Sequence, residues 1–151
     1  MALIFEMWIE SKENGEEIRN YFSSKINVYA NRKQYKIKAY KSGKTGSMIT
    51  VDNISQTGIH SKNDAEEMTE IGFQFYEYLK NAPNFRYALV GVEVDGWREI
   101  EELIDAPNDI KTMKGFVINE KIYSQIKCTV KMEEFRKDYL WLPYKGEKIL
   151  K

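Results

Sequence analysis

The chain has 151 residues, and its 23 basic and 23 acidic side chains leave no net charge. This length suits a single domain, and a domain of this size buries enough surface to fold without a disulfide or a metal. Cys128 is the only cysteine, which excludes an intramolecular disulfide, and Cys128 with the single His60 cannot make a closed zinc site. We expect a cytoplasmic protein with no metal and no cofactor.

The N-terminal segment predicts a strand followed by a helix. Residues 3–9 are rich in apolar and aromatic side chains, with one acid at Glu6, and lack the basic start of a signal peptide, which predicts a buried strand. Residues 11–15 break this strand. Residues 16–26 then place Ile18 and Phe22 at helical spacing, with acids in the first turn. No apolar run approaches the ~20 residues of a membrane span, so we expect no membrane association.

The next segment predicts a β-hairpin. Residues 34–40 alternate between apolar and polar side chains, residues 42–46 have turn chemistry, and residues 47–51 predict a second strand. Gly43-Lys44-Thr45 matches the end of a phosphate-binding loop. That loop also needs a glycine five positions before Gly43, where this chain has Lys38, and a helix after it, where this chain has a strand. The hairpin turn is therefore favoured.

A long helix and a central strand come next. Ser61 or Asn63 is positioned to cap a helix whose apolar residues fall on one stripe from Ala65 to Leu79. Residues 85–94 form the most hydrophobic segment of the chain and predict a central strand.

These elements predict an α+β fold in one domain, residues 1–151. The order β-α-β-β-α-β indicates an antiparallel sheet with two main helices on one face, a ferredoxin-like arrangement with its core at about 1–95. Residues 96–151 predict a packed extension, with short helices near 97–104 and 119–126 and a strand at 115–118.

The charges are segregated along the sequence. Residues 18–51 contain eight basic residues and no acid, whereas residues 52–105 contain twelve acids and four bases. The hairpin at residues 32–44 predicts a basic binding surface that consists of Arg32, Lys36, Lys38, Tyr40 and Lys44. An acidic protein suits this surface, and a nucleic-acid strand is the alternative. The sequence pI of about 6.6 is low for a nucleic-acid module, and lysines on an edge strand also prevent aggregation.

Two other groups of residues are candidates. Tyr139, Trp141 and Tyr144 lie close together near basic residues, as at binding hot spots, although a tail pinned to the core has the same composition. Glu93 lies within the predicted central strand, where a covered face would make it a buried carboxylate with a raised pKa.

The chain has no dinucleotide fingerprint and no nucleophile motif. We therefore expect a non-enzymatic module, of interaction or regulatory type, that binds another protein. Nucleic-acid binding through residues 32–44 is the first alternative, and an enzyme that uses a buried carboxylate is the second. The sequence leaves the oligomeric state open.

Overall fold

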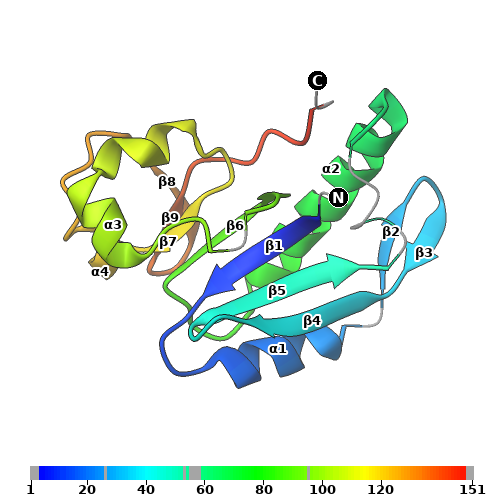
Figure 1. Ribbon diagram of the computed structural model, residues 1–151, viewed down its shortest axis with the longest axis horizontal. Helices are drawn as coiled ribbons and strands as arrows, with labels where there is room; N and C mark the ends of the chain where they lie inside the picture. The colour runs from blue at the N-terminus through cyan, green and yellow to red at the C-terminus, as the bar shows by residue number, and fades with distance from the viewer. Residues whose placement is uncertain (1–3, 26, 53, 55–58, 95, 149–151) are drawn as a thin grey trace.

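A computed structural model of the chain describes residues 4–25, 27–52, 54, 59–94 and 96–148 (Figure 1). Leu3 of the first predicted strand and Ile26 of the first predicted helix lie outside these residues. Within the described ranges, no helix is long and apolar enough to cross a membrane.

Among the described residues, seven antiparallel strands form the main sheet, in the order β4-β5-β1-β6-β7-β9-β8 (Figure 1). The strands are β1 (Phe5–Glu10), β4 (Ile37–Ser42), β5 (Gly46–Val51), β6 (Tyr87–Val92), β7 (Val117–Asn119), β8 (Glu133–Arg136) and β9 (Tyr139–Trp141). The predicted α+β class with an antiparallel sheet is confirmed. The predicted extension contributes β7, β8 and β9 to this same sheet and does not merely pack against it.

Helices α1 (Gly15–Ser23) and α2 (Lys62–Leu79) are the two main helices, as predicted. Both contribute to one hydrophobic core with Phe5, Met7 and Ile9, which point to the same face of β1 because side chains alternate along a strand. Ser61 caps α2, since its side chain accepts a hydrogen bond from the backbone N–H of Asp64.

The opposite face of the sheet is covered over β1, β6 and β7. Short helices α3 (Ile100–Asp105), η1 (Pro107–Thr112, a 3₁₀ helix) and α4 (Glu120–Tyr123) follow β6 and flank β7. Trp8 and Tyr87 pack there in a second core with Leu103 and Ile110. On β4 and β5 this face is more open, because Tyr40 is exposed and Met48 is only half-buried.

Strands β2 (Val28–Ala30) and β3 (Lys33–Tyr35) form a separate two-stranded sheet. The side-chain amide of Gln74 holds this sheet against α2, because it both donates to and accepts from the backbone of Tyr29. The continuous strand predicted over residues 34–40 was wrong. β3 pairs with β2, β4 pairs with β5, and Lys36 belongs to neither strand.

Candidate functional site

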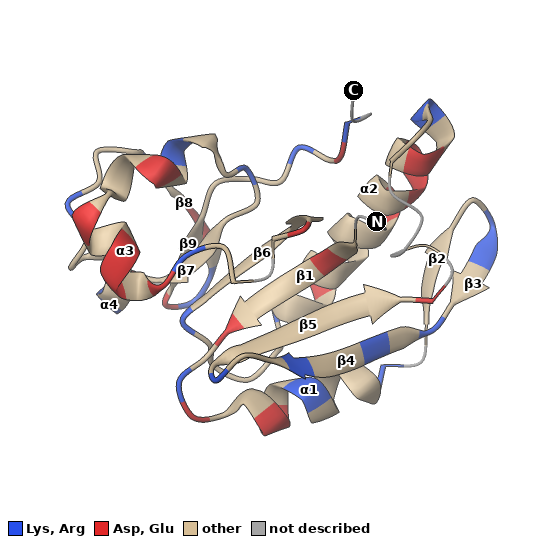
Figure 2. Ribbon diagram, in the orientation of Figure 1, with Lys and Arg blue, Asp and Glu red and all other residues tan. Residues whose placement is uncertain are grey.

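Exposed basic side chains lie on the terminal strand β4 and directly before it. Lys38 and Tyr40 are exposed on β4, and Lys36 is exposed directly before it; we call these three residues the basic edge. Figure 2 shows basic residues along β3 and β4 and acidic residues along α2 and α3. The acid-free part of the sequence therefore folds into neighbouring elements at one edge of the sheet.

Lys38 and Tyr40 lie on the same face of β4, because they are two residues apart in a strand. Tyr40 is 47% exposed, which is unusual for an aromatic side chain and leaves its ring available for contact. The Lys38 Nζ lies 3.0 Å from an Asp52 carboxylate oxygen, and this hydrogen bond raises the pKa of Lys38. Both partners are solvent-exposed, so the pair contributes little to stability and a stronger partner can replace it.

The other two residues of the predicted surface lie in turns. Arg32 and Asn31 form the turn between β2 and β3, and both have a positive φ, as a two-residue hairpin turn of type I′ requires. Lys44 lies in the turn between β4 and β5, where Ser42 pairs with Gly46. This pairing confirms the hairpin at residues 43–45, so the phosphate-loop alternative is excluded.

The aromatic residues near the C-terminus belong to the core. Tyr139 and Tyr144 are buried, and Trp141 is half-buried with its ring 5.3 Å from that of Tyr76. The Tyr139 hydroxyl donates to the backbone carbonyl of Phe85 and accepts from its N–H. The structure therefore places these three side chains where they pin β9 and the following segment, not on a binding surface.

Glu93 is exposed, which agrees with the alternative of an outward-facing residue and not with that of a buried carboxylate. β6 ends at Val92, and Glu93 has a φ of 53°, so it does not continue the alternation of the strand. The carboxylates that are buried among the described residues are Glu6 and Glu10, both in β1. The sequence contains a signal for them, since each is an acid within an otherwise apolar strand.

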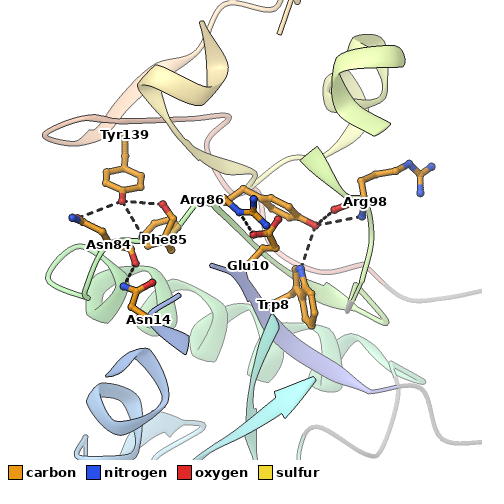
Figure 3. Close-up of polar contacts among 9 residues, drawn as sticks. Trp8, Glu10, Asn14, Asn84, Phe85, Arg86, Arg98 and Tyr139 are labelled. Atoms are coloured by element: carbon orange, nitrogen blue, oxygen red, sulfur yellow. Dashed lines mark hydrogen bonds and ion pairs between the residues drawn. The ribbon is translucent and has the colours of Figure 1, made fainter. Parts of the chain in front are cut away.

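Glu10 forms an ion pair with Arg86, 76 residues away in the sequence (Figure 3). The Glu10 side chain is 4% exposed and that of Arg86 is 26% exposed. Burial raises the pKa of Glu10, and the Arg86 guanidinium offsets part of this effect, while Glu101 and Glu99 raise the pKa further. The pair therefore holds the end of β1 against the start of β6.

A series of hydrogen bonds lies beside this ion pair (Figure 3). The Trp8 indole N–H donates to the Tyr87 hydroxyl over 3.2 Å, and this hydroxyl donates to the backbone carbonyl of Arg98. Burial raises the pKa of Tyr87 to about 12, so the phenol stays neutral and can donate this hydrogen bond at physiological pH. These hydrogen bonds connect β1 and β6 to the segment before α3.

A cleft of about 430 Å³ lies over these groups, between the β4–β5 turn and the start of α3. Glu10 and Arg86 line it together with Lys44, Glu99 and Glu101, so charges of both signs face it. Because Arg86 already neutralises Glu10, the Glu10–Arg86 ion pair serves as a link between β1 and β6. Among the described residues, no group of three or more His, Cys, Asp or Glu side chains is placed to hold a metal ion.

The comparisons with known proteins identify no relative. No family model, no curated protein and no solved structure matches the chain. The functional argument therefore rests on the chain's own residues.

Proposed function

We propose that this protein is a non-enzymatic module that binds an acidic, extended segment of a partner protein along β4. The observation that carries the proposal is the basic edge itself. Lys38 and Tyr40 are exposed on a terminal strand of six residues and Lys36 is exposed directly before it, within a stretch of sequence that contains no acid.

Strand addition fits the geometry of β4. A terminal strand presents backbone N–H and C=O groups that can pair with an incoming strand, and alternate side chains then give specificity. The exposed phenol of Tyr40 adds an aromatic contact, of the kind enriched at interfaces, between lysines that attract acidic side chains.

The same charges disfavour the two competing occupants. A second copy of β4 would bring lysines against lysines, and like charges on neighbouring strands are destabilising. A nucleic acid would also be attracted by the basic edge. However, the chain has no net charge, and the acids of α2 and α3 would repel an extended polyanion.

We further propose that the segment from β1 to β6 is ferredoxin-like. The order β4-β5-β1-β6, in which β1 lies between β5 and β6 and every pair is antiparallel, supports this assignment. In this arrangement β4 is the edge strand at one side of the core, and the C-terminal strands extend the sheet at the other side.

The test uses the double variant Lys36→Glu/Lys38→Glu and the matched control Lys114→Glu/Lys127→Glu, whose lysines are also exposed. Each protein is used to capture partners from nuclease-treated lysate of the source organism. The affinity of the captured protein is then measured by titration. We expect the wild type and the control to bind equally, and the basic-edge variant to bind at least about tenfold more weakly, or 1.4 kcal/mol.

Hydrogen exchange on the complex tests the mode of binding. Strand addition should protect backbone amides within residues 37–42, because they become hydrogen-bonded to the partner. A captured protein whose affinity is the same for both double variants would refute the proposal. Tight binding of a single-stranded oligonucleotide that Lys36→Glu/Lys38→Glu abolishes would replace it with the nucleic-acid alternative.

A further inference from the structure

A polar pocket of about 230 Å³ lies at the N-terminus of α1, on the other side of β4 from Lys38 and Tyr40. The loop between β1 and α1 forms one wall, and the β4–β5 turn forms another. Lys41 reaches this pocket because it shares the α1 side of β4 with Ile37 and Ala39, which pack in the helix-covered core.

The first turn of α1 offers free hydrogen-bond donors to this pocket. Asn14 is the N-cap residue, but its side chain makes no capping hydrogen bond and donates instead to the backbone carbonyl of Asn84 (Figure 3). Within the described part of the chain, no hydrogen bond uses the backbone N–H of Gly15, Glu16 or Glu17. Unused N–H groups at a helix N-terminus attract anions, since they carry the positive end of the helix dipole.

A buried hydroxyl at the same place is a second, independent indication of a ligand. Ser11 is only 2% exposed, it lines the pocket, and its Oγ has no hydrogen-bond partner among the described residues. This Oγ lies 3.6 Å from the position that a Cβ on Gly15 would occupy, so it faces the start of the helix. An unpartnered buried hydroxyl costs free energy, which a ligand that accepts its hydrogen bond would recover.

Basic side chains outnumber acids around the pocket. Among the residues that the structure describes, four cations line it, namely Lys12, Arg19, Lys41 and Lys44, against two carboxylates, Glu13 and Glu16. The Arg19 Nη1 donates to Ser47 Oγ over 3.1 Å and lies 2.8 Å from the Cβ position of Gly15, so the guanidinium reaches across the helix start. Because Gly15 has no side chain, the Arg19 guanidinium has room beside the helix start. The excess of two positive charges suits a dianion.

We propose that this pocket binds a phosphate group, either as free phosphate or as a phosphate monoester. A tetrahedral oxyanion of five heavy atoms needs roughly 150 Å³, about five water volumes, and the pocket provides about 230 Å³. Its several oxygens can accept hydrogen bonds from the helix N–H groups, from Ser11 Oγ and from the surrounding cations at the same time.

The test follows the backbone amide signals of the ¹⁵N-labelled full chain during titration with inorganic phosphate, at constant ionic strength maintained with chloride. We expect saturable shifts at Gly15, Glu16 and Glu17. The variant Lys41→Gln/Lys44→Gln should weaken phosphate binding about tenfold. The exposed pair Lys114→Gln/Lys127→Gln is the matched control and should bind as the wild type does.

The variant Ser11→Ala separates a ligand role from a structural role. It should weaken phosphate binding severalfold without lowering the melting temperature, because it removes a hydroxyl that has no partner in the free protein. A parallel titration with O-phosphoserine identifies the source of the phosphate. Shifts of the same amides show that the site accepts esters, and shifts with inorganic phosphate alone show that it takes the free ion.

Absence of saturable shifts at residues 15–17 with either compound would overturn the proposal. So would binding that is equally tight in Lys41→Gln/Lys44→Gln and in the control pair. Neither result would affect the proposal for the basic edge, because Lys36 and Lys38 do not line this pocket.

Discussion

Replacement of Arg86 by methionine tests whether the buried ion pair stabilises the fold. The substitution leaves Glu10, whose side chain is 4% exposed, without the cation that neutralises it. The carboxylate then either stays charged in a poorly solvated place or takes up a proton. At pH 7, about 2.5 pH units above the ordinary glutamate pKa of 4.5, protonation costs about 3.4 kcal/mol. We therefore expect a loss of about 3 kcal/mol at pH 7, near the lower end of the range for broken buried pairs.

The pH dependence of this loss has a definite sign. A carboxyl with a raised pKa in the folded state contributes stability that is present below its unfolded pKa and is lost as pH rises through its folded pKa. Because Arg86→Met raises the pKa of Glu10 further, the loss relative to wild type should shrink to about 1 kcal/mol at pH 5.

Urea denaturation followed by tryptophan fluorescence at both pH values measures this difference, since Trp8 lies beside the pair. The double variant Glu10→Gln/Arg86→Met should recover most of the loss and remove the added pH dependence. An Arg86→Met loss that is the same at pH 5 and pH 7, or a double variant as unstable as the single one, would refute the reasoning.

Four further substitutions test local features by the same denaturation assay. Gly46→Ala should cost about 2–3 kcal/mol, because a Cβ there would lie 1.7 Å from the Trp8 ring carbon Cη2. Gly43→Ala should cost only about 1 kcal/mol, because Gly43 has open space around it and the cost comes only from its φ of +64°. Arg32→Gly should stabilise the protein by about 0.5–1 kcal/mol, since arginine is strained at a φ of 63° in the β2–β3 turn. Arg136→Met should cost about 2 kcal/mol, because the Arg136 Nη1 donates to the carbonyls of Leu79 and Ala82 at the C-terminal end of α2. Equal losses of stability for the two glycine variants would contradict the clash with Trp8. A destabilised Arg32→Gly would contradict the strain at Arg32, and an unaffected Arg136→Met would contradict the role of Arg136 at the end of α2.

Local patterns predicted the elements that carry a strong periodicity. The apolar stripe from Ala65 to Leu79 and the cap at Ser61 correspond to α2, and the apolar segment 85–94 contains β6. The hairpin formed by β8 and β9 was not predicted. It turns at Lys137-Asp138, where Asp138 has a φ of 70°, and no glycine marks this turn in the sequence.

Pairing between distant residues was beyond the reach of local patterns. The alternation over residues 34–40 is real, but it does not show that β3 and β4 pair with different strands. Glu10 and Arg86 come together because β1 and β6 are neighbours in the sheet, which no local spacing encodes. At Glu93 the predicted strand was too long, because it ran two residues beyond the end of β6, to residue 94.

The two proposed sites share β4, and this places them in electrostatic contact. Lys38 and Lys41 lie on opposite sides of one strand, three residues or about 10 Å apart along it, so their charges influence each other mainly at low ionic strength, where the Debye length is longer. A phosphate dianion beside Lys41 would lower the positive potential that attracts an acidic segment to Lys38. Because coupling between two binding sites is reciprocal, a bound acidic partner would weaken phosphate binding by the same factor. Basic residues of the acid-free stretch would then contribute to the binding of two anionic ligands that compete through charge without touching each other.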